Sequence, residues 1–162
     1  MADEKEKKKN PDFILVDATN AIIGRLASVV AKWLLLGKRV VIINAEKAVI
    51  TGKLDAIMEE LETWWNIRGS VNPERAPKHY VRPDLFLKRK IRGMLPWKQA
   101  KGRLAYKRLR VYIGCPIEFR KLKPIKIPEA DASKLRCKYF QIGEILKRFG
   151  WKGISEWKVP LK

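Results

Sequence analysis

Two short, uninterrupted apolar runs on either side of one amphipathic segment constrain the fold of this chain most strongly. The runs cover residues 13–16 and 40–43, and the second consists entirely of β-branched residues. Strands that are apolar without alternation are typical of a parallel sheet covered on both faces. Parallel neighbours need a long crossover connection, usually a helix, so the spacing predicts a strand–helix–strand unit.

The segment between the two runs has the pattern of that helix. Leu26, Val29, Val30 and Trp33 follow one another at helical spacings, which places them on one face. Gly37 stands where a left-handed residue commonly ends a helix. Similar patterns predict the remaining elements, which are helices over 54–65, 84–94 and 102–107, a strand over 109–113 and a last helix near 141–149. The sequence therefore predicts an α/β fold with a small, mainly parallel sheet.

We expect three parts in the 162-residue chain. Residues 1–11 form a charged tail, residues 12–116 an α/β domain, and residues 117–162 a C-terminal extension with the last helix. Within the domain, residues 68–83 contain three prolines and lack a helical period, which predicts an extended loop.

Positive charge is concentrated in one part of the chain. Fourteen lysines and arginines lie between Arg68 and Arg110, against only two acids, Glu74 and Asp84. This local excess of +12 makes up most of the formal net charge of +19. Crowded like charges destabilise a folded protein, so the region implies a polyanionic partner. Nucleic acid is the first candidate, because each phosphate paired with Lys or Arg releases condensed counterions.

Aromatic side chains within the basic region point to RNA. Tyr80, His79 and Trp97 have flat faces that could stack on unpaired bases, although His79 could equally be an exposed loop histidine. The sequence shows no recognition-helix pair, zinc finger, aromatic RNP strand or GxxG loop. A long basic loop that adapts to an irregular surface therefore favours folded RNA.

Motifs for catalysis, cofactors and metals are missing from the sequence. Gly52 and Lys53 resemble the end of a phosphate-binding loop, but the positions that need glycine and Ser or Thr hold Lys47 and Leu54. One histidine and two distant cysteines are too few for a zinc framework. We expect no catalytic residue, metal, cofactor or small-molecule substrate.

No segment approaches the roughly 20 apolar residues of a membrane span, and the charged N-terminus lacks the apolar centre of a signal peptide. We therefore expect a cytoplasmic protein without a membrane partner.

Three segments together resemble one known family. They are residues 16–28 (VDATNAIIGRLAS), residues 41–52 (VIINAEKAVITG), and residues 92–98 (RGMLPWK), the last followed by Gly102, Arg103 and residues 111–114. In order and spacing they are similar to the universal large-subunit ribosomal protein thirteen family, in its archaeal and eukaryotic cytosolic form. The resemblance extends over residues 13–116.

The resemblance implies a three-layer α/β/α fold, binding to large-subunit rRNA, neighbouring ribosomal proteins as partners, and a structural role in assembling and holding the large subunit. Together with the charge pattern, it gives the residues expected to contact RNA: Arg68, Arg75, Lys78, His79, Tyr80, Arg82, Lys88, Arg89, Lys90, Arg92, Gly93, Met94, Pro96, Trp97, Lys98, Lys101, Arg103, Lys107 and Arg108. For Gly93 a purely structural role, at the C-terminus of a helix, stays open.

Two other functions remain as alternatives. An enzyme acting on RNA would need a nucleotide, cofactor or metal site, for which we find no residues. A regulator that binds other RNA outside the ribosome could use the same basic surface.

Overall fold

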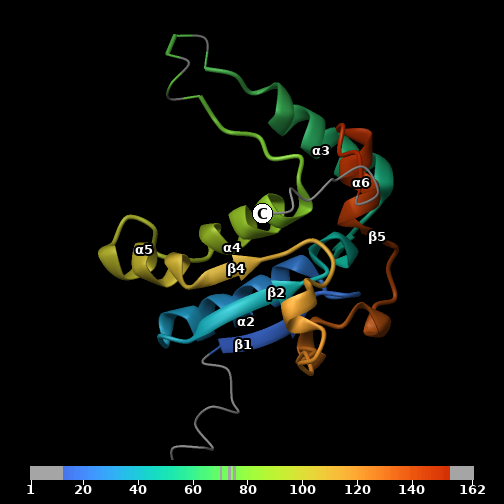
Figure 1. Cartoon of the computed structure of the whole chain (residues 1–162). Helices are drawn as coiled ribbons and strands as arrows, with labels where there is room; N and C mark the ends of the chain where they lie inside the picture. The colour runs from blue at the N-terminus through green and yellow to red at the C-terminus, as the bar shows by residue number, and fades with distance from the viewer. Residues whose placement is uncertain (1–12, 70, 73, 75, 154–162) are drawn as a thin grey trace, which may run out of the picture.

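The computed structural model describes residues 13–69, 71–72, 74 and 76–153, and the predicted tail over residues 1–11 lies outside them. Its central sheet consists of three parallel strands, β1 (Phe13–Asp17), β2 (Arg39–Ile43) and β4 (Leu109–Val111). Strand β2 lies in the middle, with Ile42 beside Val16 on one side and Val111 on the other (Figure 1). The predicted α/β fold around a mainly parallel sheet is confirmed.

Helix α2 (Ile23–Leu35) connects β1 to β2 and packs its apolar stripe against the core. Leu26, Val30 and Leu34 are fully buried at four-residue spacing, as one face of a helix requires. The helix ends before Gly37, whose φ of 90° is a conformation that glycine adopts without steric cost.

Helix α4 (Pro83–Gly93) packs on α2 and fixes the position of the basic segment. Phe86, Leu87 and Ile91 form its buried side, and each such side chain contributes roughly 1.5–3 kcal/mol when fully buried. Helix α5 (Ala100–Lys107) follows and also contacts α2. Apart from Asp84, which is buried, the charged side chains of α4 and α5 consequently lie on the sides away from the core.

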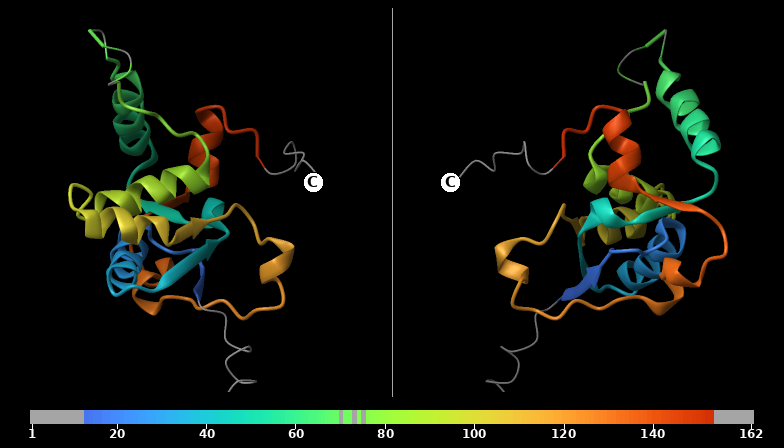
Figure 2. Two further views of the ribbon diagram at one scale, coloured as in Figure 1. Left: turned by 60° about the vertical axis from the view of Figure 1, so that its left-hand side comes forward. Right: turned by 90° about the vertical axis from the view of Figure 1, so that its right-hand side faces the viewer.

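Helix α3 (Leu54–Asn66) is different, because only Ile57 of its thirteen residues is buried. It stands away from the sheet and leads into the basic loop, as both further views show (Figure 2). Its acidic side chains Asp55, Glu59 and Glu62 are exposed. In the view of Figure 1, the arm formed by α3 and the basic loop lies above α4.

The two faces of the sheet are covered differently. Helices α2 and α4 belong to the large apolar cluster on one face. On the other face Leu15, Val41 and Ile43 pack against Tyr112, Phe119 and Leu122, which belong to an irregular segment with one short 3-10 turn (Ile117–Phe119). Among the described residues, the α-helical cover is thus on one face and the irregular cover on the other.

The segment after this turn pairs with the outer edge of β1 and with the loop that follows this strand. The Ile125 N–H donates to the Leu15 carbonyl oxygen at 2.8 Å, and the Ala132 N–H donates to the Asn20 carbonyl oxygen at 2.9 Å. A second, antiparallel sheet then pairs β3 (Val49–Thr51) with β5 (Tyr139–Gln141), and helix α6 (Ile142–Arg148) follows.

A polar cluster marks the end of β1. The carboxylate of Asp17 accepts hydrogen bonds from the side chains of Thr19 at 2.7 Å and Asn44 at 2.9 Å. Partial burial raises the pKa of Asp17, but these hydrogen bonds outweigh it and the pKa lies below its ordinary value. The ionised carboxylate therefore holds the two loops that follow β1 and β2 together.

Close packing between α5 and the turn before it requires glycine at one position. A Cβ atom on Gly102 would lie 2.2 Å from the carbonyl oxygen of Pro96, which is a main-chain atom and cannot rotate away. By contrast, a Cβ atom on Gly93 would meet nothing within 4 Å. The two glycines near the basic segment thus have different structural roles.

We predict that Gly102→Ala lowers the free energy of unfolding by about 1–3 kcal/mol, because the turn and α5 must separate. Gly93→Ala is the matched control and should leave stability unchanged or raise it by up to about 1 kcal/mol, since alanine is the better helix former. Urea denaturation of the two variants measures the difference. Equal midpoints would contradict the close contact at Gly102.

Candidate nucleic-acid interface

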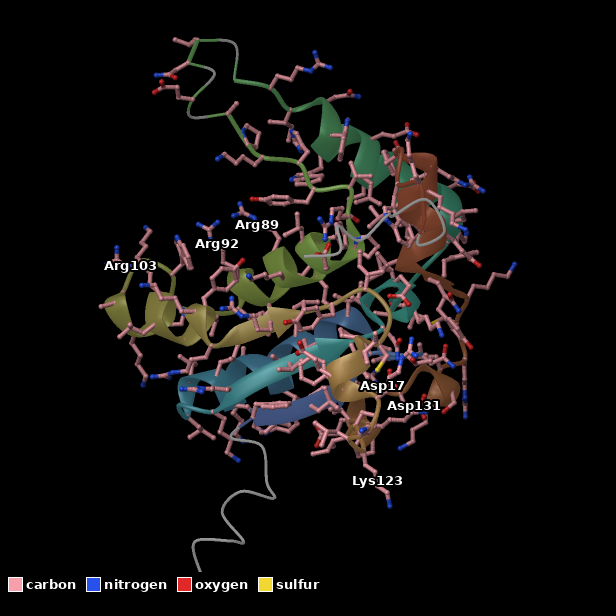
Figure 3. All side chains as sticks on the ribbon, viewed as in Figure 1. Asp17, Arg89, Arg92, Arg103, Lys123 and Asp131 are labelled. Carbon is pink, nitrogen blue, oxygen red and sulfur yellow. The ribbon has the colours of Figure 1, made fainter. Side chains whose placement is uncertain are left out.

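The outer sides of α4 and α5 carry a group of exposed cations. Arg89 and Lys90 are exposed on α4, and Lys101 and Arg103 are exposed on α5. Figure 3 shows that the side chains of Arg89, Arg92 and Arg103 rise on the same side of the molecule, toward the loop that follows α3. We call this surface, with Arg89, Lys90, Arg92, Lys101 and Arg103, the α4–α5 face.

The helical period explains why these cations gather. Positions 86, 87 and 91 of α4 are buried, so Arg89 and Arg92 share the opposite face at three-residue spacing. The acid of this helix, Asp84, is paired with Arg82 at 2.7 Å. Neither Arg89 nor Lys90 forms an ion pair with a described residue. The face therefore keeps its positive charge available for an external anion.

Trp97 packs within the protein. The guanidinium of Arg92 lies over its ring, 3.8 Å from the centroid, and Tyr106 meets it edge-on with ring centroids 5.2 Å apart. The Lys88 ammonium lies 5.1 Å from the centre of the Tyr106 ring. Burial raises the pKa of Tyr106 above its ordinary value despite the nearby Arg92, so its phenol stays neutral. One face of Trp97 is thus covered by Arg92, and a base that stacked there would have to displace it.

His79 also has partners in the protein. Its Nε2 lies 3.0 Å from the carbonyl oxygen of Ile67, and its ring centroid lies 4.5 Å from that of Trp64 and 5.2 Å from that of Trp65. Trp65 in turn packs against Phe149 after α6, with centroids 5.8 Å apart. This aromatic cluster ties the basic loop to α3 and α6. A role of His79 in RNA binding stays a prediction.

The other residues expected to contact RNA differ in how far their side chains are exposed to solvent. Exposed among them are Arg68, Lys78, Gly93, Met94, Lys98, Lys107 and Arg108. Partly buried are Tyr80, Arg82, Lys88 and Pro96. Arg75 lies outside the described residues. The guanidinium of Arg108 reaches the carbonyl oxygen of Leu34 at 3.4 Å, and Met94 lies in a shallow hollow with Leu35 of α2. These two side chains therefore turn toward α2.

A partly enclosed cavity of about 280 Å³ lies between α3 and α4, next to the α4–α5 face. We call it the α3–α4 cavity, and its lining residues are Glu60, Leu61, Trp64, Tyr80, Phe86, Arg89, Lys90 and Gly93. Glu60, Trp64 and Phe86 were not among the residues predicted to contact RNA. From helical periodicity alone, Glu60 is interpreted as a solvated acid and the two aromatic residues as core. Periodicity does not show that α3 and α4 lie next to each other, so it could not predict the cavity.

Two further features of the structure concern metal binding and membrane insertion. Within the described ranges, no three His, Cys, Asp or Glu side chains come together in a group that could hold a metal ion. Of the helices in the described part of the chain, none has the length and apolar character needed to cross a membrane.

The family follows from a comparison with known proteins. The family model described as Ribosomal protein L13 matches residues 11–118, more than half of the chain. The chain belongs to this family. The membership confirms the resemblance seen in the three motifs, and the match includes α4, α5 and the α4–α5 face.

Several archaeal members of the L13 family resemble the chain over most of its length. It is 45% identical to large ribosomal subunit protein uL13 of Methanopyrus kandleri over 144 residues, covering 87% of this chain and 89% of that protein. For the proteins of the same name from Methanosarcina barkeri and Archaeoglobus fulgidus, the identities are 46% and 41%. Those alignments cover 85% and 91% of this chain, and 98% and 94% of the relatives. The similarity therefore reaches beyond residue 118 into the C-terminal extension.

We predict that Trp97→Leu lowers the free energy of unfolding by about 1–2 kcal/mol, because it removes the packing of this ring on Arg92 and Tyr106. Chemical denaturation at neutral pH measures the loss. Lys98→Leu, at the exposed neighbouring position, is the control and should change stability by less than about 0.5 kcal/mol. A variant at position 97 that is as stable as the parent protein would show that the ring packing contributes nothing to folding.

Proposed function

We propose that this chain is a structural component of the large ribosomal subunit in the cytoplasm, where it binds and stabilises folded large-subunit rRNA beside neighbouring ribosomal proteins. Its role is to hold RNA in place, and the chain catalyses no reaction. The observation that carries the proposal is family membership over residues 11–118, together with relatives named as large ribosomal subunit proteins.

The physical features of the α4–α5 face support the proposed role. Its cations stand on two helices that are fixed by burial against α2, and Arg89 and Lys90 have no acidic partner among the described residues. A phosphate backbone provides the missing negative charge, and its binding is driven by release of counterions. Rigid helices hold the charges at set positions, which suits RNA that is already folded.

Sedimentation of cell extract tests the assignment. The full-length chain, carrying a small tag, should travel with large subunits at moderate salt and stay with them after a high-salt wash. An RNA-modifying enzyme or a regulator of other RNAs would collect in the light fractions, and that distribution would contradict the proposal.

We further predict that replacing Arg89, Lys90 and Arg103 by glutamine weakens RNA binding and flattens its dependence on salt. The slope of log K against log salt should fall by about 0.7–0.9 for each phosphate that the variant no longer neutralises. Arg92 is kept because it packs on Trp97. Binding to large-subunit rRNA, measured over a series of salt concentrations, gives the slope.

The control for this experiment makes the same charge change elsewhere. Arg120, Lys121 and Lys123 are exposed near the 3-10 turn on the other side of the molecule, where Figure 3 labels Lys123. Their replacement by glutamine should leave most of the slope intact. An equal loss of slope in both triple variants would mean that net charge, and not the α4–α5 face, governs binding.

A further inference from the structure

We propose that the α3–α4 cavity receives a single unstacked base of the bound RNA and prefers guanine. The inference rests on the proposed function, since RNA must be the partner of this surface, but it concerns a different interaction. The α4–α5 face attracts phosphates of any sequence, whereas a cavity that encloses a base distinguishes one nucleotide from another.

The walls of the cavity have the chemistry of a base-stacking site. Trp64, Tyr80 and Phe86 line a volume of about 280 Å³, which is just below the range of about 300–1,000 Å³ for pockets that enclose whole small ligands and suits a single base. Sequence-specific RNA recognition commonly takes up bases that have left the helical stack and places them against aromatic rings.

Two of the rings are held in place before any ligand arrives. Trp64 is fixed by its edge contact with His79, and Phe86 is 4% exposed on the inner side of α4. Tyr80 is only partly buried, and no other aromatic ring of the described residues packs against it. Tyr80 is therefore the ring with a face left for a ligand. A pre-formed site saves the entropy of ordering side chains on binding.

Charge at the cavity favours a nucleotide over an apolar peptide. Arg89 and Lys90 line the cavity and form no ion pair with a described residue. A base carries a phosphate on its own sugar, so aromatic walls next to two cations match both parts of one nucleotide. An apolar side chain of a neighbouring protein would fill the walls but bring no anion to Arg89 or to Lys90, whose ammonium lies 5.4 Å from the centre of the Phe86 ring.

Glu60 indicates which base the cavity prefers. Its side chain lines the same cavity and has no hydrogen-bond or ion-pair partner among the described residues. An ionised carboxylate only accepts hydrogen bonds, and it would weaken a site that served phosphate alone. Guanine presents two adjacent N–H donors on its Watson–Crick edge, which a carboxylate can accept together. Uracil presents oxygen atoms on either side of a single N–H and is disfavoured.

Short RNAs that differ in one base test the proposal directly. Four eleven-nucleotide oligouridines, holding G, A, C or U at the central position, carry the same number of phosphates. Differences in their affinity for the full-length protein, measured by fluorescence anisotropy, therefore isolate recognition of the base. We expect the guanine oligonucleotide to bind at least about fivefold more tightly than the all-uridine one, as stacking and edge contacts of this kind provide.

Matched variants locate the preference in the cavity. Glu60→Gln should reduce the preference for guanine, whereas Glu59→Gln, one position away and outside the lining, should retain it. Tyr80→Leu should lower affinity for the guanine oligonucleotide about 5- to 150-fold, while Tyr80→Phe keeps the stacking ring and most of the affinity. Thermal unfolding of each variant shows that the fold is retained.

Failure of this inference can be told apart from failure of the proposed function. Kethoxal modifies the N1 and N2 positions of unpaired guanine, so subunits containing the wild-type chain should protect one guanine that Glu60→Gln subunits expose. A chain that never enters large subunits overturns the function. Three other results overturn the base site. They are a chain that enters large subunits but protects no guanine, equal affinity for all four oligonucleotides, and cavity variants whose only defect is the loss of a neighbouring protein.

Discussion

The apolar contact of α2 with the sheet and with α4 is the interaction on which the molecule depends. Leu26, Val30 and Leu34 of α2 are fully buried, as are Leu87 and Ile91 of α4. Because the inner side of α4 is buried against this layer, the cations of α4 lie on its opposite, solvent-exposed side. The same burial that stabilises the fold therefore arranges the charges, and repulsion between them is tolerated because the apolar layer outweighs it.

Local patterns in the sequence predict the elements of this fold well. Uninterrupted apolar runs gave β1 and β2, helical spacing gave α2, α3 and α4, and three motifs pointed to the family that the comparison confirmed. These features are local, since a strand or helix imprints its own period on the chain. The exposure of the cations on α4 and α5 was predictable for the same reason, because residues on one exposed helical face recur every three or four positions in the sequence.

Contacts between distant segments could not be read in this way. Nothing near His79 in the sequence shows that it packs on Trp64 and Trp65. Even the contact of Arg92 with Trp97, five residues later, depends on the turn between them. Likewise, the sequence predicts Glu60 to be one more acid on a solvated helix, and only the structure shows that it lines a cavity between α3 and α4. Aromatic side chains in a basic region are equally suited to packing inside and to stacking on RNA, so only the three-dimensional arrangement separates the two uses.

The hydrogen bonds from Ile125 and Ala132 to β1 and its following loop have a wider consequence. The outer edge of a sheet presents unpaired main-chain groups that can take up a strand from another chain. Here Ile125 pairs in parallel with Val16, so a later residue of the same chain occupies main-chain groups on the outer edge of β1. Strand addition at this edge would first have to displace that residue, whereas new RNA contacts need only surface changes on the helices.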